Sequence, residues 1–433
     1  MPTATAVARL EACLARVREQ PLVFTKTYPE QARVEAEAAD ARARVGLSLG
    51  PLDGTMVSVK DLFDVRGEPT LAGSKVARGN AAAAEDAVVV RRLRRAGAVI
   101  VGKTAMAEFA FSGLGLHPYA GTPGNATDPE RVPGGSSSGA GVSAANGSCE
   151  IAIGTDTGGS VRIPAALNGV VGFKPTVGRI PLEGTFPLAY SLDSIGPLAR
   201  SVDQCAAADA VMAGEEPRPL HAATLPGLRV GVPRGRLLEG LEPLVSQAFE
   251  AALGRLSDAG AYVADHAIED MLVAFAEASK PGYLVAIEAA AIHADWLDTQ
   301  ADAFDPRVRA RILRGRTVAA TDYIRMMRTR DALIRAMDLH LADLDVLALP
   351  TTPATAPLIA PLRDDDDAFF QANALMLRNT TPANVFDLTA ITLPIPGLER
   401  PAGLMLWARR GHDRRLLSIA KAVEALLART HSA

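Results

Sequence analysis

The sequence predicts an α/β protein in which a central β-sheet carries helices on both of its faces. Short runs of apolar and β-branched residues alternate with helix-like stretches over residues 55–104, and the same alternation returns over 151–173. Strands and helices that alternate in this way form a sheet covered by helices. The 433 residues are 48% hydrophobic, so the chain can bury a large core around such a sheet.

The N-terminal elements follow from the spacing of their apolar residues. Apolar and alanine positions recur at intervals of three and four over residues 4–19 and 30–45, which predicts two amphipathic helices. Residues 55–65, TMVSVKDLFDV, form a short run rich in β-branched side chains. This run is therefore predicted to be a buried strand that follows the two helices.

The segment EDAVVVRRLRRAGAVIVGKTAM is predicted to contain three elements in succession. A helix extends to about Ala96 and stops at Gly97, a strand follows over 98–102, and a new helix starts at Thr104. A further helix is predicted over about 201–213, where apolar residues again recur at helical spacing.

The second half of the chain repeats the same class of structure. Residues 215–227 are polar and proline-rich and form the best candidate for a boundary, after which a strand restarts at Leu228. Residues 270–342 are predicted to be mostly helical. The acidic run 364–367 is best explained as a solvated surface turn, because adjacent aspartates cannot all converge on one metal ion. Since both sides of the boundary belong to one class, we predict a single domain over 1–433.

Charge and composition exclude several kinds of partner. The net charge of −4 and the pI near 6.0 favour neither a nucleic acid nor an anionic membrane surface. The first twenty residues lack the basic start and apolar run of a secretory signal, and no stretch approaches the ~18 apolar residues of a membrane span. Cys13, Cys149 and Cys205 lie far apart, so free thiols in a reducing compartment are expected. We expect a soluble, cytoplasmic protein.

A dense serine–glycine stretch over residues 133–164 permits two opposite interpretations, a flexible linker or a rigid site. The apolar strand-like run CEIAIGTDT in its interior argues against a linker, which would stay polar throughout. GGSSSGA is predicted to open a helix at 138–146, and GTDTGGS to form a tight loop after a strand at 151–153. Exposed N–H groups in such loops bind a phosphate or the oxyanion of acyl transfer, and the phosphate-binding motifs do not match here.

Acyl transfer requires a nucleophile and a base. None of the seven histidines is adjacent to either loop, His117 being the nearest, although a distant histidine could fold in. A buried, neutral lysine can serve as the base instead, with a serine relaying the proton. Lys60, Lys103 and Lys174 are all flanked by apolar residues, and the composition does not distinguish among them.

These motifs resemble the amidase signature family. The blocks that carry the resemblance occur in the family's order and spacing over about residues 50–205: MVSVKDLFDV, AGAVIVGKTAMAEFA, PGGSSSGA, IGTDTGGSVRIPAALNGVVGFKPTVGRI and SLDSIGPLARSV. More scattered resemblance continues in LPTTPATAP, LRNTTPANVFDLTAITLP and the C-terminal tail. It implies the amidase signature fold, a mixed sheet in one domain, with the motifs in a core over 50–215. The rest of the fold, 216–433, contains the helical excursion near 270–342.

The resemblance implies a catalytic set of two serines and a lysine. The family's lysine maps to Lys60, its bridging serine, which follows a cis peptide bond, to Ser136, and its nucleophile to Ser160. Ser160 would attack the amide carbonyl, Ser136 would pass the proton and Lys60 would be the final base. The structural alternatives are a helix-capping role for Ser160, a turn or cap role for Ser136, and a buried pair of Lys60 with Asp61 or Asp64.

The same resemblance assigns supporting roles. Backbone N–H groups of the substrate-binding loop would hold the oxyanion, and they belong to Thr157, Gly158, Gly159 and Ser160. The Thr157 side chain is expected to be incidental. Ser137, Asp156 and Arg162 are expected to orient these loops through hydrogen bonds. Lys103, Lys174 and the histidines are assigned to packing and surface positions.

The expected activity is hydrolysis of a small carboxylic amide to its acid and ammonia or an amine, without a metal or an organic cofactor. Two alternatives are kept: a ureide hydrolase of the biuret or allophanate type, and the amidase-like subunit of a tRNA-dependent amidotransferase. That subunit commonly has glutamine where SVRIPAA has Ile163, which counts against it. A non-catalytic binding protein would show a broken catalytic set, whereas this set is intact. Family members are often dimers, but no stretch identifies an interface, so a homodimer stays open.

Overall fold

The computed structural model describes residues 4–117 and 119–429. The strands are β1 (Phe24–Thr27), β2 (Met56–Lys60), β3 (Val99–Thr104), β4 (Ile151–Asp156), β5 (Val171–Lys174), β6 (Ser194–Ala199), β7 (Arg229–Val232), β8 (Tyr262–Asp265), β9 (Val346–Pro350), β10 (Thr389–Pro394) and β11 (Gly403–Ala408). The helices are α1 (Ala6–Glu19), α2 (Pro29–Arg44), α3 (Val88–Arg95), α4 (Ser138–Asn146), α5 (Arg162–Asn168), α6 (Val202–Ala213), α7 (Pro243–Asp258), α8 (Glu269–Ala278), α9 (Leu284–Ile292), α10 (Ala294–Thr299), α11 (Pro306–Arg316), α12 (Ala320–His340), α13 (Ile359–Asp364), α14 (Asp366–Leu377), α15 (Thr381–Val385) and α16 (Asp413–Ala428).

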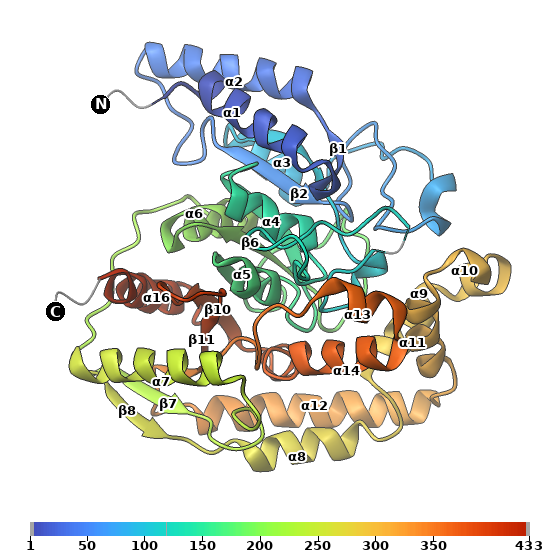
Figure 1. The fold of residues 1–433 in the computed structure, drawn as a ribbon, viewed down its shortest axis with the longest axis vertical. Helices are drawn as coiled ribbons and strands as arrows, with labels where there is room; N and C mark the ends of the chain where they lie inside the picture. Colours follow the sequence, from blue (N-terminus) through green and yellow to red (C-terminus); the bar gives the residue numbers. More distant parts are fainter. Residues whose placement is uncertain (1–3, 118, 430–433) are drawn as a thin grey trace.

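The strands form one 11-stranded sheet in the order β1-β3-β2-β4-β6-β5-β10-β11-β9-β7-β8. Strands β3, β2 and β4 are parallel, as are β9, β7 and β8, while the strands between these two groups run antiparallel. The sheet extends from β1 near the N-terminal helices α1 and α2 to β7 and β8 at the opposite end of the molecule (Figure 1). This arrangement confirms the prediction of a mixed sheet in an α/β fold.

Helices cover both faces of the sheet, as alternate residues of β4 demonstrate. Ile151 and Ile153 belong to a core cluster that includes Cys205 of α6, whereas Ala152 packs in a separate cluster with Ala140 of α4. Neighbouring residues of a strand point to opposite faces, so α6 and α4 lie on opposite sides of the sheet. The prediction of helices on both faces is confirmed.

Residues on both sides of the predicted boundary at 215–227 contribute to this one sheet. The chain leaves α6, passes through the irregular segment 214–228 and enters β7, which joins the sheet through β9. Strands β10 and β11 then lie between β9 and β5. The helical excursion comprises α8 to α12, and α8 and α12 pack side by side (Figure 1). The single domain over 1–433 stays our interpretation of this continuity.

Two local predictions differ from the structure. The helix predicted from Thr104 is wrong: β3 continues to Thr104 and only a short 3₁₀ turn, η3 (Glu108–Ala110), follows. The N–H group of Ala107 donates to the carbonyl of Ser136 (3.0 Å) instead of entering a helix. The acidic run at 364–367 is exposed as predicted, but it starts α14, where the Asp365 carboxylate accepts a hydrogen bond from the N–H of Ala368 (3.0 Å).

The described residues hold neither of two further features. None of their helices combines the length and the hydropathy that a membrane span requires. Nor does any group of three or more histidine, cysteine, aspartate or glutamate side chains among them have the arrangement of a metal site. Cys13, Cys149 and Cys205 are all buried free thiols.

Candidate active site

Lys60 lies at the carboxyl end of β2, the buried strand that the sequence predicts around it. Its side chain is fully buried, and Nζ donates hydrogen bonds to Ser136 Oγ (2.7 Å) and to Thr155 Oγ1 (2.9 Å). Neither aspartate of the structural alternative pairs with it: Asp61 forms an ion pair with Lys103 (3.0 Å), and Asp64 accepts a hydrogen bond from a threonine. Both partners of Lys60 are therefore hydroxyl groups.

Burial lowers the pKa of Lys60 to about 7, because a desolvated ammonium group is costly. The negative charges of Asp193 and Asp156 act in the opposite direction and limit the shift. A substantial fraction of Lys60 is consequently a neutral amine near pH 7, and a neutral amine can accept a proton.

Ser136 is placed by the glycine-rich turn that precedes α4. The Gly135–Ser136 peptide bond is cis. The N–H of Gly135 donates to the carbonyl of Gly113 (2.8 Å), and the carbonyl of Ser136 accepts from Ala107. The segment that follows β3 thus runs along Ser136 and fixes it from both sides, with its hydroxyl directed at Lys60.

Ser160 closes the loop between β4 and α5, and its side chain is 4% exposed. The N–H of Ser137 donates to the carbonyl of Ser160 (3.3 Å), so the two serine motifs are in direct contact. No hydrogen bond joins the hydroxyl groups of Ser136 and Ser160 in this structure, although both residues are described. Catalytic hydrogen bonds of free enzymes often tighten only when the substrate binds.

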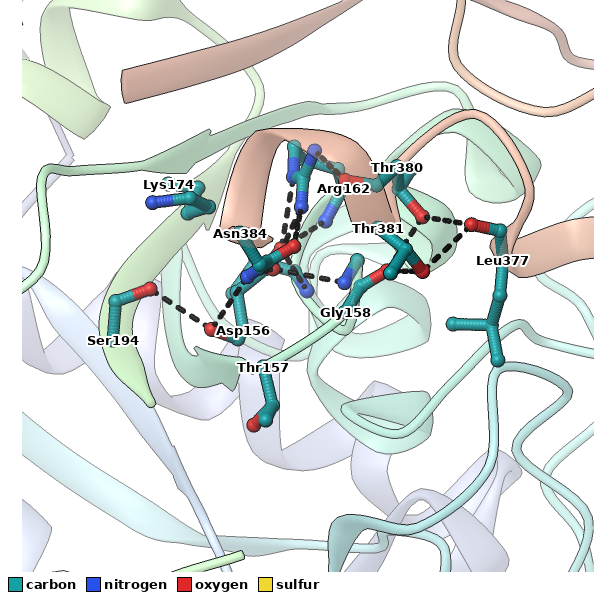
Figure 2. Close-up of polar contacts among 12 residues, drawn as sticks. Asp156, Thr157, Gly158, Arg162, Lys174, Ser194, Leu377, Thr380, Thr381 and Asn384 are labelled. Carbon is teal, nitrogen blue, oxygen red and sulfur yellow. Dashed lines mark hydrogen bonds and ion pairs between the residues drawn. The ribbon is translucent and has the colours of Figure 1, made fainter. Parts of the chain in front are cut away.

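A buried ion pair between Asp156 and Arg162 holds this loop. Arg162 Nη2 lies 2.8 Å from Asp156 Oδ1, Arg162 Nε lies 3.0 Å from Asp156 Oδ2, and neither side chain is exposed (Figure 2). The carboxylate also accepts the N–H groups of Gly159 (2.9 Å) and Val161 (3.1 Å). Burial alone would raise the pKa of Asp156, but the charge and hydrogen bonds of Arg162 outweigh this and hold it well below its usual value.

The loop leaves three of its four expected oxyanion donors free. Among the described residues, none accepts the backbone N–H of Thr157, Gly158 or Ser160. The N–H of Gly159 is already donated to Asp156, which corrects the expectation that it also binds the oxyanion, since an N–H has one proton to donate. Gly159 adopts a φ of +134°, a conformation that favours glycine.

The comparisons with known proteins can now be set beside this geometry. The family model described as Amidase matches residues 8–417. The chain belongs to the amidase family. A solved amidase structure superposes on it with a TM-score of 0.86, 36% sequence identity and coverage of 98% of this chain and 96% of the other.

Two relatives show how widely the chemistry of this amidase family extends. The chain is 39% identical to the 2-amino-5-chloromuconic acid deaminase of Comamonas testosteroni, covering 99% of this chain and 94% of the relative. It is 35% identical to the amidase-family component of the glutamyl-tRNA(Gln) amidotransferase of Chloroflexus aurantiacus, covering 98% of this chain and 93% of that relative. The family therefore supports amide-type hydrolysis in general, and a substrate has to be argued from this chain's own residues.

The remaining expected residues of this amidase fold lie as follows. Ser137 is buried, and its Oγ lies 3.3 Å from the carbonyl of Thr155. Lys174 is buried and donates to the carbonyl of Pro175 (2.7 Å), and burial lowers its pKa to about 8. His117 is buried with Nε2 2.8 Å from the carbonyl of Gly73. These contacts agree with the packing roles expected for Lys174 and His117.

Sequence reasoning missed two groups of residues at this site. The Thr157 hydroxyl, expected to be incidental, donates to the buried Asp193 carboxylate (2.5 Å), which also accepts the N–H groups of Leu188 and Ala189. The second group comes from residues 380–384, where Asn384 Nδ2 donates to Asp156 Oδ1 (2.9 Å) and Asn384 Oδ1 accepts from Arg162 (2.6 Å) (Figure 2). The sequence block TTPAN carried a resemblance, but nothing in it indicated contact with the loop.

Proposed function

We propose that this chain hydrolyses a small amide through an acyl-enzyme on Ser160, with Ser136 and Lys60 as its proton relay. The observation that carries this proposal is the hydrogen bond from the buried, largely uncharged Lys60 to Ser136, in a turn that contacts Ser160. A buried lysine whose pKa lies near 7 is suited to act as a general base at neutral pH.

In the first half of the proposed reaction, Ser160 Oγ forms a bond to the amide carbonyl carbon. Its proton passes to Ser136, whose own proton passes to Lys60. The oxyanion is held by the N–H groups of Thr157, Gly158 and Ser160. The C–N bond then breaks as the proton returns through Ser136 to the leaving nitrogen, and ammonia or an amine departs.

In the second half, water attacks the acyl-enzyme on the same carbonyl carbon. Water gives its proton to the same relay, the bond between Ser160 Oγ and the acyl carbon breaks, and the proton returns to Ser160 as the acid leaves. No metal or organic cofactor takes part in these steps. The residues of this chain supply every proton transfer.

The substrate class is inferred from Arg311 on α11. Its guanidinium group is half-buried, donates to the carbonyl of Phe111 and lies 4.0 Å from the centre of the Phe111 ring. No carboxylate in the described part of the chain lies within ion-pair distance of it, and burial lowers its pKa to about 10. Phe111 stands two residues before Gly113, which bonds to Gly135 beside Ser136. An uncompensated cation beside the catalytic turn favours a substrate that carries a carboxylate.

This inference orders the alternatives. It favours the monoamide of a short dicarboxylic acid, and among ureides it favours allophanate, which carries a carboxylate, over biuret, which does not. The relative that deaminates 2-amino-5-chloromuconic acid acts on an acid by name. Glutamine also carries a carboxylate, so the amidotransferase alternative is retained, with Ile163 as the observation against it.

The test measures ammonia release from matched pairs, succinamate against succinamide and allophanate against biuret, together with glutamine. We expect the carboxylate-bearing member of at least one pair to have the higher kcat/KM. Equal turnover within every pair would contradict the assignment of Arg311. Glutamine hydrolysis that appears only after partner subunits are added would favour the amidotransferase alternative.

Replacing Arg311 with glutamine should raise KM for the carboxylate-bearing substrate by about 10- to 100-fold, the loss expected when a charged hydrogen bond is removed. KM for the neutral member of the pair should stay within about twofold, since it makes no ionic contact. Arg314→Gln is the matched control, because Arg314 is on the same helix, is exposed and stacks on Phe370. A rise in KM of equal size for both substrates would show a general structural effect instead.

A further inference from the structure

We infer that Thr380 is a positioning residue for the oxyanion loop, and that its hydroxyl locks the peptide group between Gly158 and Gly159. This inference rests on the proposed function, because it concerns the N–H groups that would hold the oxyanion. Thr380 lies more than 200 positions from this loop in the sequence and directly precedes α15. Nothing in the serine–glycine motifs themselves identifies it.

The carbonyl of Gly158 has a strong donor in Thr380. Thr380 Oγ1 lies 2.6 Å from the carbonyl oxygen of Gly158, and the Thr380 side chain is fully buried (Figure 2). The two residues approach so closely that a Cβ atom added to Gly159 would collide with Thr380 Oγ1. The loop and the hydroxyl group therefore fit each other only when position 159 is glycine.

The same peptide group is held at its other end. The N–H of Gly159 donates to Asp156 Oδ1 (2.9 Å), so the carbonyl and the N–H of one peptide plane are both bound, on opposite sides. A peptide between two glycines lacks the side-chain contacts that normally resist rotation of the plane. Its orientation then depends on these two hydrogen bonds. Rotation of the plane would change φ and ψ on either side and redirect the N–H groups of Gly158 and Ser160.

The Thr380 hydroxyl is itself fixed by buried charged groups. Arg162 Nη1 donates to the carbonyl of Thr380 (2.9 Å). At the other end of α15, the buried Arg330 donates from Nε to the carbonyl of Val385 (2.9 Å) and from Nη2 to that of Asn384 (3.2 Å). Both ends of this short helix are thus held, and Thr380 has little freedom to move away from Gly158.

The neighbouring Thr381 provides a natural comparison. Thr381 Oγ1 lies 2.8 Å from the carbonyl of Leu377 and 3.2 Å from that of Gly158, whereas Thr380 Oγ1 lies 3.4 Å and 2.6 Å from these two carbonyls. Each hydroxyl has one proton, so the shorter distances assign Thr380 to Gly158 and Thr381 to Leu377. The two threonines are adjacent in sequence but have different main acceptors.

The experiment compares Thr380→Val, which removes the hydroxyl with little change in shape, with Thr380→Ser, which retains it. The substrate is the panel amide that the unmodified protein hydrolyses fastest. We expect Thr380→Val to lower kcat by about 10- to 100-fold, somewhat less than the direct loss of an oxyanion donor, with KM within about threefold. Thr380→Ser should restore kcat to within about threefold, and Thr381→Val should have less than about a fivefold effect.

Three further readouts separate positioning from a general loss of structure. Melting temperatures and far-UV circular dichroism are measured for every variant, and Thr380→Ala provides a second hydroxyl-free variant if the valine variant does not fold. The pH at which kcat/KM reaches half its maximum should not move, because the Lys60 environment is unchanged. Unchanged kcat in both hydroxyl-free variants, or equal losses in Thr380→Val and Thr380→Ser, would overturn the inference. Ser160→Ala is run in parallel: if that variant remains active, the proposed nucleophile is wrong, whereas activity lost in Ser160→Ala but unchanged in Thr380→Val rejects only the role of Thr380.

Discussion

Replacing Ser160 with alanine should lower the rate of ammonia release by about 10⁴-fold or more, since the acyl-enzyme cannot form without its nucleophile. KM should change little, because Ser160 contributes its hydroxyl to the reaction and not to the walls of the pocket. The measurement is ammonia release from the best panel amide under saturating conditions, with the variant's folding checked by circular dichroism.

Ser143→Ala is the matched control for this substitution. Ser143 is a fully buried serine on α4 whose hydroxyl donates to the carbonyl of Ala140 (3.1 Å), away from the loop that carries Ser160. Its removal should leave kcat within about threefold. If Ser160→Ala retained a tenth of the activity, or if both serine variants lost activity equally, the assignment of Ser160 would fail.

Replacing Lys60 with methionine should lower kcat by about 10²- to 10⁴-fold, the range associated with the loss of a general base. The pH dependence gives this prediction its specificity. Lys60 acts as a base only when it is neutral, and it is neutral above its pKa of about 7. In the unmodified protein, kcat/KM should therefore rise as the pH rises through about 7 and then become level.

The Lys60→Met variant should lose this rise along with most of its activity. Lys280→Met is the control, because the Lys280 side chain is 69% exposed and pairs only with Glu277 on the surface. It should keep both the rate and the pH profile. A Lys60→Met variant that kept a rise of kcat/KM near pH 7 would show that another group, and not Lys60, is the titrating base.

The choice among the three buried lysines shows where sequence reasoning ends. Lys60, Lys103 and Lys174 have similar apolar neighbours in the sequence, and the pattern alone cannot rank them. In the structure they differ in what they contact: Lys103 pairs with Asp61, Lys174 donates to a backbone carbonyl and Lys60 donates to the hydroxyl of Ser136. Only the resemblance to a family could select Lys60 beforehand, because the partners come from distant parts of the chain.

Local patterns predicted the main elements well where burial and periodicity agree. The helix at 138–146 has the predicted bounds, and β2 lies within the predicted strand at 55–65. The prediction failed after Thr104, where apolar residues suggest a helix but the N–H of Ala107 is taken by Ser136. Tertiary hydrogen bonds overrode local propensity there, as they do around many binding sites.

The supporting groups of the loop were the least predictable part of the site. Asp156 and Arg162 lie close together in sequence, so a mutual orienting role could be expected from the motif. Asn384 and Thr380 reach the same loop from the other half of the chain, and short-range sequence patterns do not encode such contacts. The use of the Gly159 N–H by Asp156 likewise depends on the exact path of the loop.

The central claim, an acyl-enzyme on Ser160, is tested most directly by mass spectrometry of the protein quenched in acid during turnover of its best amide. The account predicts a mass increase equal to the acyl group, located by proteolysis on the peptide that contains Ser160 and missing from Ser160→Ala. An acyl group found on another residue would contradict it. So would steady turnover with no adduct on Ser160 in a variant such as Thr380→Val and in the unmodified protein alike.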